Sequence, residues 1–220
     1  MKDTRVKERL DRIAALTSEG YAMKALAVVR QTKAEMLAAG LADPLLLGWI
    51  RYYEFRALYD VQGWKEIDEL FRQPEPQTLS MPLKNAAWIQ SVAGEAASRL
   101  GDAREVARRM EACYTMRLED GDPVSAVQAL QTACVLLARM GRPEMNTAFA
   151  DRLIEAGLRF DATNAILQGL HLLADNYEKA PRTTVRRRLE RGRTLLPSEV
   201  EPEFMEEARR VLERLRKLVD

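Results

Sequence analysis

The stretch SRLGDAREVARRM, residues 98–110, has one glycine between two segments rich in helix-forming residues. Gly101 suits the left-handed backbone conformation that ends a helix. Asp102, with Glu105 three residues later, is typical of the capping box that begins the next helix. We therefore predict a helix-turn-helix corner at this glycine.

The same corner recurs along the chain. Comparable glycines stand at Gly20, Gly63 and Gly141, and the four corners are 43, 38 and 40 residues apart. Self-similarity at a nearly fixed period indicates helix-pair repeats. A fifth corner is expected near residues 178–184, where Pro181 has the place of a first-turn proline and no glycine is present.

Helical periodicity extends over the whole chain, and no stretch has the sustained alternation of a β-strand. Prolines in residues 72–82 form an irregular linker that ends one helix early. Expected N-cap residues are Asp43 and Asp122, each before a proline, and Asp161 and Ser198, the last with Glu201 three residues on. The expected helices span residues 3–18, 21–40, 44–62, 64–72, 82–100, 103–118, 123–140, 143–158, 162–178, 181–195 and 199–218.

We therefore predict an all-α fold in one domain, residues 1–220, with about five antiparallel helix pairs in a right-handed α-solenoid. A C-terminal capping helix, about residues 199–218, completes it. Its apolar stripe consists of Phe204, Ala208, Val211, Leu212, Leu215 and Leu218.

Charge, hydropathy and cysteine spacing argue against several classes of function. With 34 Lys and Arg against 33 Asp and Glu, the net charge is +1, so no overall field attracts nucleic acid or an anionic membrane. The sequence lacks an apolar run of transmembrane length and a signal-peptide core, so we expect a cytoplasmic protein. Cys113 and Cys134 lie in apolar helical patterns without metal-ligand spacing and are predicted to be buried thiols.

His171 is the only histidine in the chain, so multi-histidine metal sites are excluded. Its helical neighbours Gln168 and Asp175 supply no nucleophile, and no phosphate-binding or zinc-protease motif occurs. We therefore expect neither catalysis nor a cofactor.

The segment AAWIQSVAGEAASRLGDAREVARRM, residues 86–110, resembles the tetratricopeptide (TPR) family. Gly94 matches the small close-packing position of that family, seven residues before Gly101, and Cys134 stands at the same distance before Gly141. The period near 40 exceeds the usual 34 or so, which is typical of degenerate TPR units in bacterial regulatory proteins, and HEAT-like repeats are the competing fold.

The resemblance implies a concave groove lined by the first helix of each pair. Its ligand-facing positions would lie thirteen, ten, six, three and two residues before the corner glycine. Transferred to this chain, they are Ile50, Tyr53, Ala57, Asp60 and Val61, then Trp88, Ser91, Glu95, Ser98 and Arg99, then Gln128, Gln131, Val135, Ala138 and Arg139.

Two further patterns on these helices have both a structural and a functional interpretation. Asn164, Gln168, His171 and Asp175 form a polar stripe that faces either solvent or a partner. Trp49, Tyr52, Tyr53 and Tyr59 are either core residues or interface anchors.

A basic segment follows the polar stripe. Its guanidinium groups either bind an anionic partner or pair with the acidic residues 199–207, and nucleic acid is disfavoured because no aromatic residues are interleaved. The arginines are Arg182, Arg186, Arg187, Arg188, Arg191 and Arg193.

These patterns favour a non-catalytic interaction module that binds a protein or peptide in the groove, in regulation or complex assembly. Tyrosine and tryptophan would supply anchors, and Arg99, Arg139 and Glu95 would supply charge complementarity. Two alternatives stay open: a small-molecule sensor with a deep pocket between helices 44–62 and 82–100, and a homodimer or scaffold that self-associates through the C-terminal helix.

Overall fold

The computed structural model describes residues 3–41, 43–73, 80–177 and 202–219. They belong to two compact units, Met1–Asp102 (unit 1) and Ala103–Asp220 (unit 2). Both units are helical, and the described residues contain no strand. The boundary between the units lies at the corner of Gly101.

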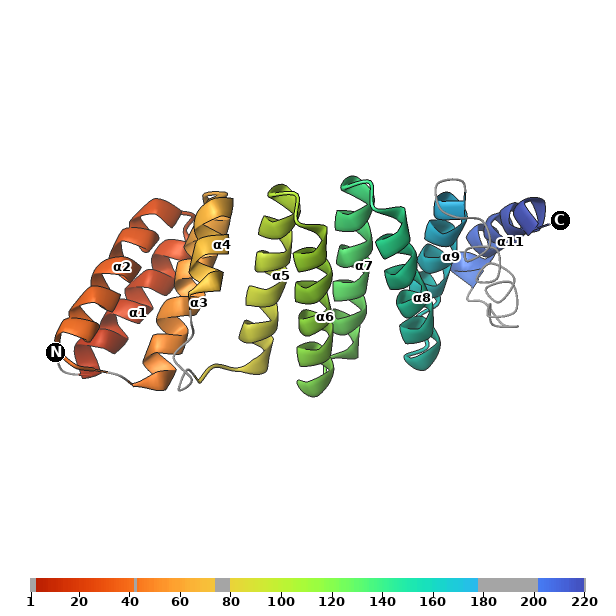
Figure 1. The fold of residues 1–220 in the computed structure, drawn as a ribbon. Coiled ribbons are helices and arrows are strands. Elements are labelled where there is room, and N and C mark those ends of the chain that lie inside the picture. Colours follow the sequence, from red (N-terminus) through yellow and green to blue (C-terminus); the bar gives the residue numbers. More distant parts are fainter. Residues whose placement is uncertain (1–2, 42, 74–79, 178–201, 220) are drawn as a thin grey trace. The chain divides into compact units, whose positions relative to one another are not determined.

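In unit 1, each helix contacts the next one along the chain, and α3 also contacts α1 and α5 (Figure 1). Its helices are α1 (Asp3–Ser18), α2 (Ala22–Ala38), α3 (Pro44–Asp60), α4 (Trp64–Arg72) and α5 (Leu83–Arg99). The linker prolines end α4 early, as predicted from the sequence.

Unit 2 repeats this pattern, since consecutive helices contact each other and α7 also contacts α9. Helix α11 packs on α9. The elements are α6 (Ala103–Glu119), α7 (Pro123–Arg139), α8 (Pro143–Arg159), α9 (Thr163–Tyr177), the 3-10 turn η1 (Pro202–Phe204) and α11 (Met205–Val219).

Three of the four corner glycines have the predicted left-handed conformation: φ is 79° at Gly20, 84° at Gly101 and 64° at Gly141. The prediction for Gly63 was wrong by one residue. Gln62 has the positive φ of 57°, while Gly63 has φ of −75° and immediately precedes α4. The amide of Gly63 donates to the carbonyl of Leu58 over 2.9 Å, which closes the end of α3 around Gln62.

Two of the predicted N-caps are confirmed. The Asp43 carboxylate accepts from the amide of Leu45 over 2.8 Å, and that of Asp122 accepts from the amide of Ser125 over 3.0 Å. Asp161 is not a cap, because its φ of 53° gives it the left-handed position at the end of α8. Ser198, the expected fifth corner and the helix expected at 181–195 lie outside the described residues.

Apolar side chains join the helices within each unit. In unit 1, Phe55 of α3 is fully buried with Ile67 of α4 and Ile89 of α5. In unit 2, the predicted apolar stripe of α11 is confirmed, since Val211 and Leu215 are buried against α9. Helix α11 begins at Met205 and not at 199.

Buried polar groups add specific contacts between helices. In unit 1, the guanidinium of Arg51 donates to the carbonyl of Leu70 over 3.0 Å. In unit 2, the Asn146 amide donates to the carbonyl of Cys134 over 2.7 Å and accepts from Asn176 over 3.2 Å. Cys113 and Cys134 are buried as predicted, and burial raises the pKa of Cys134 to about 12.

Candidate interaction surfaces

The one-residue shift at Gln62 changes which residues of α3 face outward. Ile50 and Ala57, counted from Gly63, are 1% and 0% exposed and belong to the core, so they cannot contact a ligand. Counting from Gln62 replaces them with Trp49 and Arg56, which are half-buried. The corrected positions are Trp49, Tyr52, Arg56, Tyr59 and Asp60.

Five aromatic rings of unit 1 form a continuous cluster, which we call the aromatic surface: Trp49, Tyr52, Tyr59, Trp64 and Trp88. The Tyr52 and Trp88 rings have centres 5.3 Å apart, and those of Tyr59 and Trp88 are 6.0 Å apart. Edge contacts of this kind stabilise beyond area burial by about 0.5–1.5 kcal/mol each. All five residues are half-buried, so the cluster both joins α3 to α5 and leaves ring surface accessible.

Charged groups surround the aromatic surface and largely pair with one another. The Tyr59 hydroxyl donates to the Glu95 carboxylate over 3.2 Å, and Arg99 lies 3.6 Å from the same carboxylate. The Arg56 guanidinium lies 5.6 Å from the centre of the Trp88 ring. Burial, together with the nearby carboxylate of Glu95, raises the pKa of Tyr59. Glu95 therefore links Tyr59 of the aromatic surface to Arg99.

A depression of about 340 Å³ lies between α1 and α3. The predicted residue Tyr53 lines it with Trp49, and Leu45, 48% exposed, stands at its edge. Burial raises the pKa of Tyr53. The other lining residues are Lys7, Leu10, Asp11 and Leu46.

Unit 2 has a different depression, of about 150 Å³, between α7 and α9. The predicted residues Gln128 and Gln131 line it together with Asn164. Its other lining residues are Pro123, Val124, Val127, Phe160 and Ala162, so none of the lining residues is ionisable.

The predicted polar stripe of α9 is divided between two environments. His171 and Asp175 face α11, where they lie 3.4 Å from Glu207 and 2.6 Å from Arg214 respectively. The side chains of Asn164 and Gln168 form no hydrogen bond within the described ranges.

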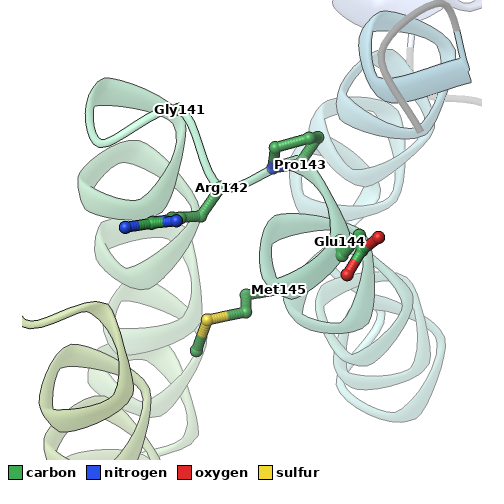
Figure 2. Close-up of a pocket in the computed structure, with 5 residues that line it drawn as sticks. All are labelled: Gly141, Arg142, Pro143, Glu144 and Met145. Carbon is green, nitrogen blue, oxygen red and sulfur yellow. The ribbon is translucent and has the colours of Figure 1, made fainter.

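A third depression, of about 280 Å³, is formed by residues 141–145 at the corner between α7 and α8. Figure 2 shows that the Arg142 and Glu144 side chains point to opposite sides of this corner. Because no polar groups converge there, the arrangement does not favour a specific ligand.

The remaining predicted residues are dispersed. Asp60 is exposed and lies 3.5 Å from Arg56, Ser91 is half-buried on α5, and Arg139 is exposed near the end of α7. The arginines 182–193 lie outside the described residues.

The predicted groove positions left out Tyr52, Arg56 and Tyr59 because they were counted from Gly63, although the two tyrosines were named as core residues or interface anchors. A signal was present: one polar residue separates Gly101 and Gly141 from the next helix, whereas Trp64 follows Gly63 directly. Lys7 and Leu10 were also missed, although the same count from Gly20 would have given them.

Comparison with known proteins identifies no family for this chain. No protein-family model matches the chain, and no curated protein matches its sequence. Within the described residues, no helix is long and apolar enough to cross a membrane. The same residues include no group of three His, Cys, Asp or Glu side chains arranged to hold a metal ion.

Proposed function

We propose that this protein is a non-catalytic interaction module that binds a segment of another protein or a peptide along the first helices of its helix pairs. The contacts of α1 with α3, α3 with α5 and α7 with α9 support this proposal, because each places alternate helices side by side. A TPR-like, right-handed arrangement of antiparallel helix pairs and a location in the cytoplasm stay part of the proposal.

The depression between α1 and α3 is the observation that carries the proposal. Trp49 and Tyr53 line it, and both are half-buried, so a bound apolar side chain would cover the rings that are still accessible. Tyrosine and tryptophan provide much of the binding energy at protein interfaces when they become fully desolvated. Lys7 and Asp11 on α1 form a polar rim around this apolar centre, as in typical interfaces.

Site-specific photo-crosslinking tests the proposal. A photoreactive residue replaces Leu45, at the edge of the depression, and in a matched control it replaces Lys65, which is exposed on α4. After irradiation in cell extract, we expect defined proteins to be captured at position 45 and not at position 65. Adding Tyr53→Ala should reduce that capture, whereas Tyr114→Ala, which removes a half-buried tyrosine of α6, should not.

Three outcomes contradict the proposal. Equal capture at both positions indicates nonspecific contact. Capture only of a second copy of this chain supports self-association, and a small molecule as the only crosslinked species supports the sensor function.

A further inference from the structure

We propose that a surface of unit 2 with four side-chain amides, the amide surface, binds the main chain of an extended, uncharged polypeptide segment. The amide surface consists of Gln128, Gln131, Asn164 and Gln168. This inference rests on the proposed function and deepens it by naming the chemistry of the partner.

Charge is the first argument. None of the residues lining the depression between α7 and α9 is ionisable, so a phosphate or a carboxylate would meet no opposite charge there. The depression between α1 and α3, by contrast, has Lys7 and Asp11 at its edge. An uncharged occupant is therefore favoured in unit 2.

Unused hydrogen-bonding capacity is the second argument. Across the residues that the structure describes, the four side-chain amides have no hydrogen-bond partner, whereas the buried amides Asn146 and Asn176 bond to each other. A side-chain amide offers an oxygen acceptor and N–H donors, which match those of a peptide group. Asn164 and Gln168 are separated by a rise of about 6 Å along the helix. Peptide groups that face the same side of an extended chain repeat at about 6.6 Å, so one segment can bond to both amides.

Apolar surface next to the amides is the third argument. Val124 is 68% exposed and lines the same depression as Gln128 and Gln131. A volume of about 150 Å³ lies below the range of about 300–1,000 Å³ typical of pockets for small-molecule ligands. The depression therefore fits one small aliphatic side chain of a peptide whose main chain lies on the amides.

Nuclear magnetic resonance of the full-length, 15N-labelled chain tests this inference through the side-chain NH2 signals. The probe is a mixture of uncharged short peptides with acetylated and amidated ends. The comparison probe is the same mixture with alternate main-chain nitrogens methylated, which removes N–H donors. We expect the signals of the four amides to shift with the first mixture and much less with the second.

Variants locate the effect. Gln128→Leu combined with Gln131→Leu keeps side-chain size and should weaken peptide binding roughly ten-fold or more, because two hydrogen bonds are lost. Gln31→Leu removes an exposed amide of α2 and should leave the affinity unchanged.

Four results would overturn the inference: no shift of the amide signals, equal shifts with both mixtures, equal loss of affinity in the Gln31 variant, or shifts that follow protein concentration without peptide. The last indicates a second copy of the chain as occupant. Capture at position 45 without a response of the amides would overturn this inference and leave the proposed function supported. Amide shifts without protein capture at position 45 would support this inference and contradict the assignment of binding to the depression between α1 and α3.

Discussion

Arg51 in unit 1 and Asn146 in unit 2 are both buried polar residues that bond to a carbonyl of a neighbouring helix. In unit 1 the buried group is a guanidinium that also lies 5.6 Å from the Phe55 ring centre. In unit 2 it is a neutral amide that is linked to a second one, Asn176. The two units thus connect consecutive helices with different chemistry.

The same difference extends to close packing and to the surface. Two glycines let α8 and α9 approach closely: a Cβ at Gly169 would lie 2.5 Å from Ile154, and one at Gly157 would lie 2.7 Å from Ile166. In unit 1 the tightest glycine, Gly48 of α3, instead approaches the backbone before α5, where a Cβ would overlap the carbonyl oxygen of Ser80. Half-buried aromatic rings lie between α3 and α5. The period near 40 therefore constrains the helix lengths and corners, while the contact chemistry varies between units.

Replacing Asn146 by alanine is expected to have the largest effect. The substitution leaves the Cys134 carbonyl and the Asn176 amide without this buried partner, which should lower the free energy of unfolding by about 3 kcal/mol. Native-state hydrogen exchange measures the loss helix by helix. We expect it in α7, α8 and α9.

The matched variant in unit 1 is Arg51→Met, which keeps the apolar stem and removes the hydrogen bond to Leu70. Its effect should appear in α3 and α4. Equal loss of protection throughout the chain in both variants would show that the two units unfold together. The different buried polar groups would then not give the two units different stabilities.

Gly169→Ala should have the next largest effect. The new methyl group would lie 2.9 Å from the carbonyl oxygen of Ala150, which is backbone and cannot rotate away. Overpacking of this kind should lower the free energy of unfolding by about 2 kcal/mol, measured by chemical denaturation. Adding Ile154→Ala, which removes the Cγ1 atom that would lie 2.5 Å from the new methyl group, should make the double variant more stable than the sum of the two single changes predicts. Higher stability of Gly169→Ala, as helix propensity alone predicts, would contradict the close approach.

Sequence periodicity was sufficient to predict the helices that the structure describes, because most of their ends depend on local signals. Asp43 and Asp122 cap their helices within a few residues, and the prolines after α4 act on the backbone directly. Gln62 and Asp161 were missed because the prediction placed each left-handed corner at a glycine. Both have a positive φ that ordinarily favours glycine. At each of them the next amide closes the helix end: Gly63 donates to Leu58, and Ala162 donates to Gly157.

The predicted positions of the candidate surfaces depended on which residue forms the corner of each helix pair, so these surfaces could be predicted only in part. The counts from Gly101 and Gly141 gave four residues that the structure places at the surfaces described above. Trp88 is part of the aromatic surface, Glu95 lies beside it, and Gln128 and Gln131 line the depression between α7 and α9. The count from Gly63 gave the buried Ile50 and Ala57. The contacts of His171 and Asp175 with α11 were also missed, because they join residues that are distant in sequence.

The smallest expected effect is on the pH dependence of the free energy of unfolding. We compare one ion-paired glutamate from each unit. Hydrogen bonding from Arg108, supported by Arg109, lowers the pKa of Glu105 in unit 2 from 4.5 to about 2, and hydrogen bonding from Arg9 lowers that of Glu35 in unit 1. A lowered folded-state pKa stabilises the protein above pH 4.5, and this contribution disappears as the pH falls toward about 2.

Glu105→Gln should therefore lower the free energy of unfolding by about 1 kcal/mol at neutral pH, since solvent screens the pair, and by nothing near pH 2. Glu35→Gln, on an exposed ion pair, should show the same direction with a smaller amplitude. Denaturant unfolding of both variants across this pH range measures the difference, and a Glu105→Gln effect that does not change with pH would contradict the ion-pair origin.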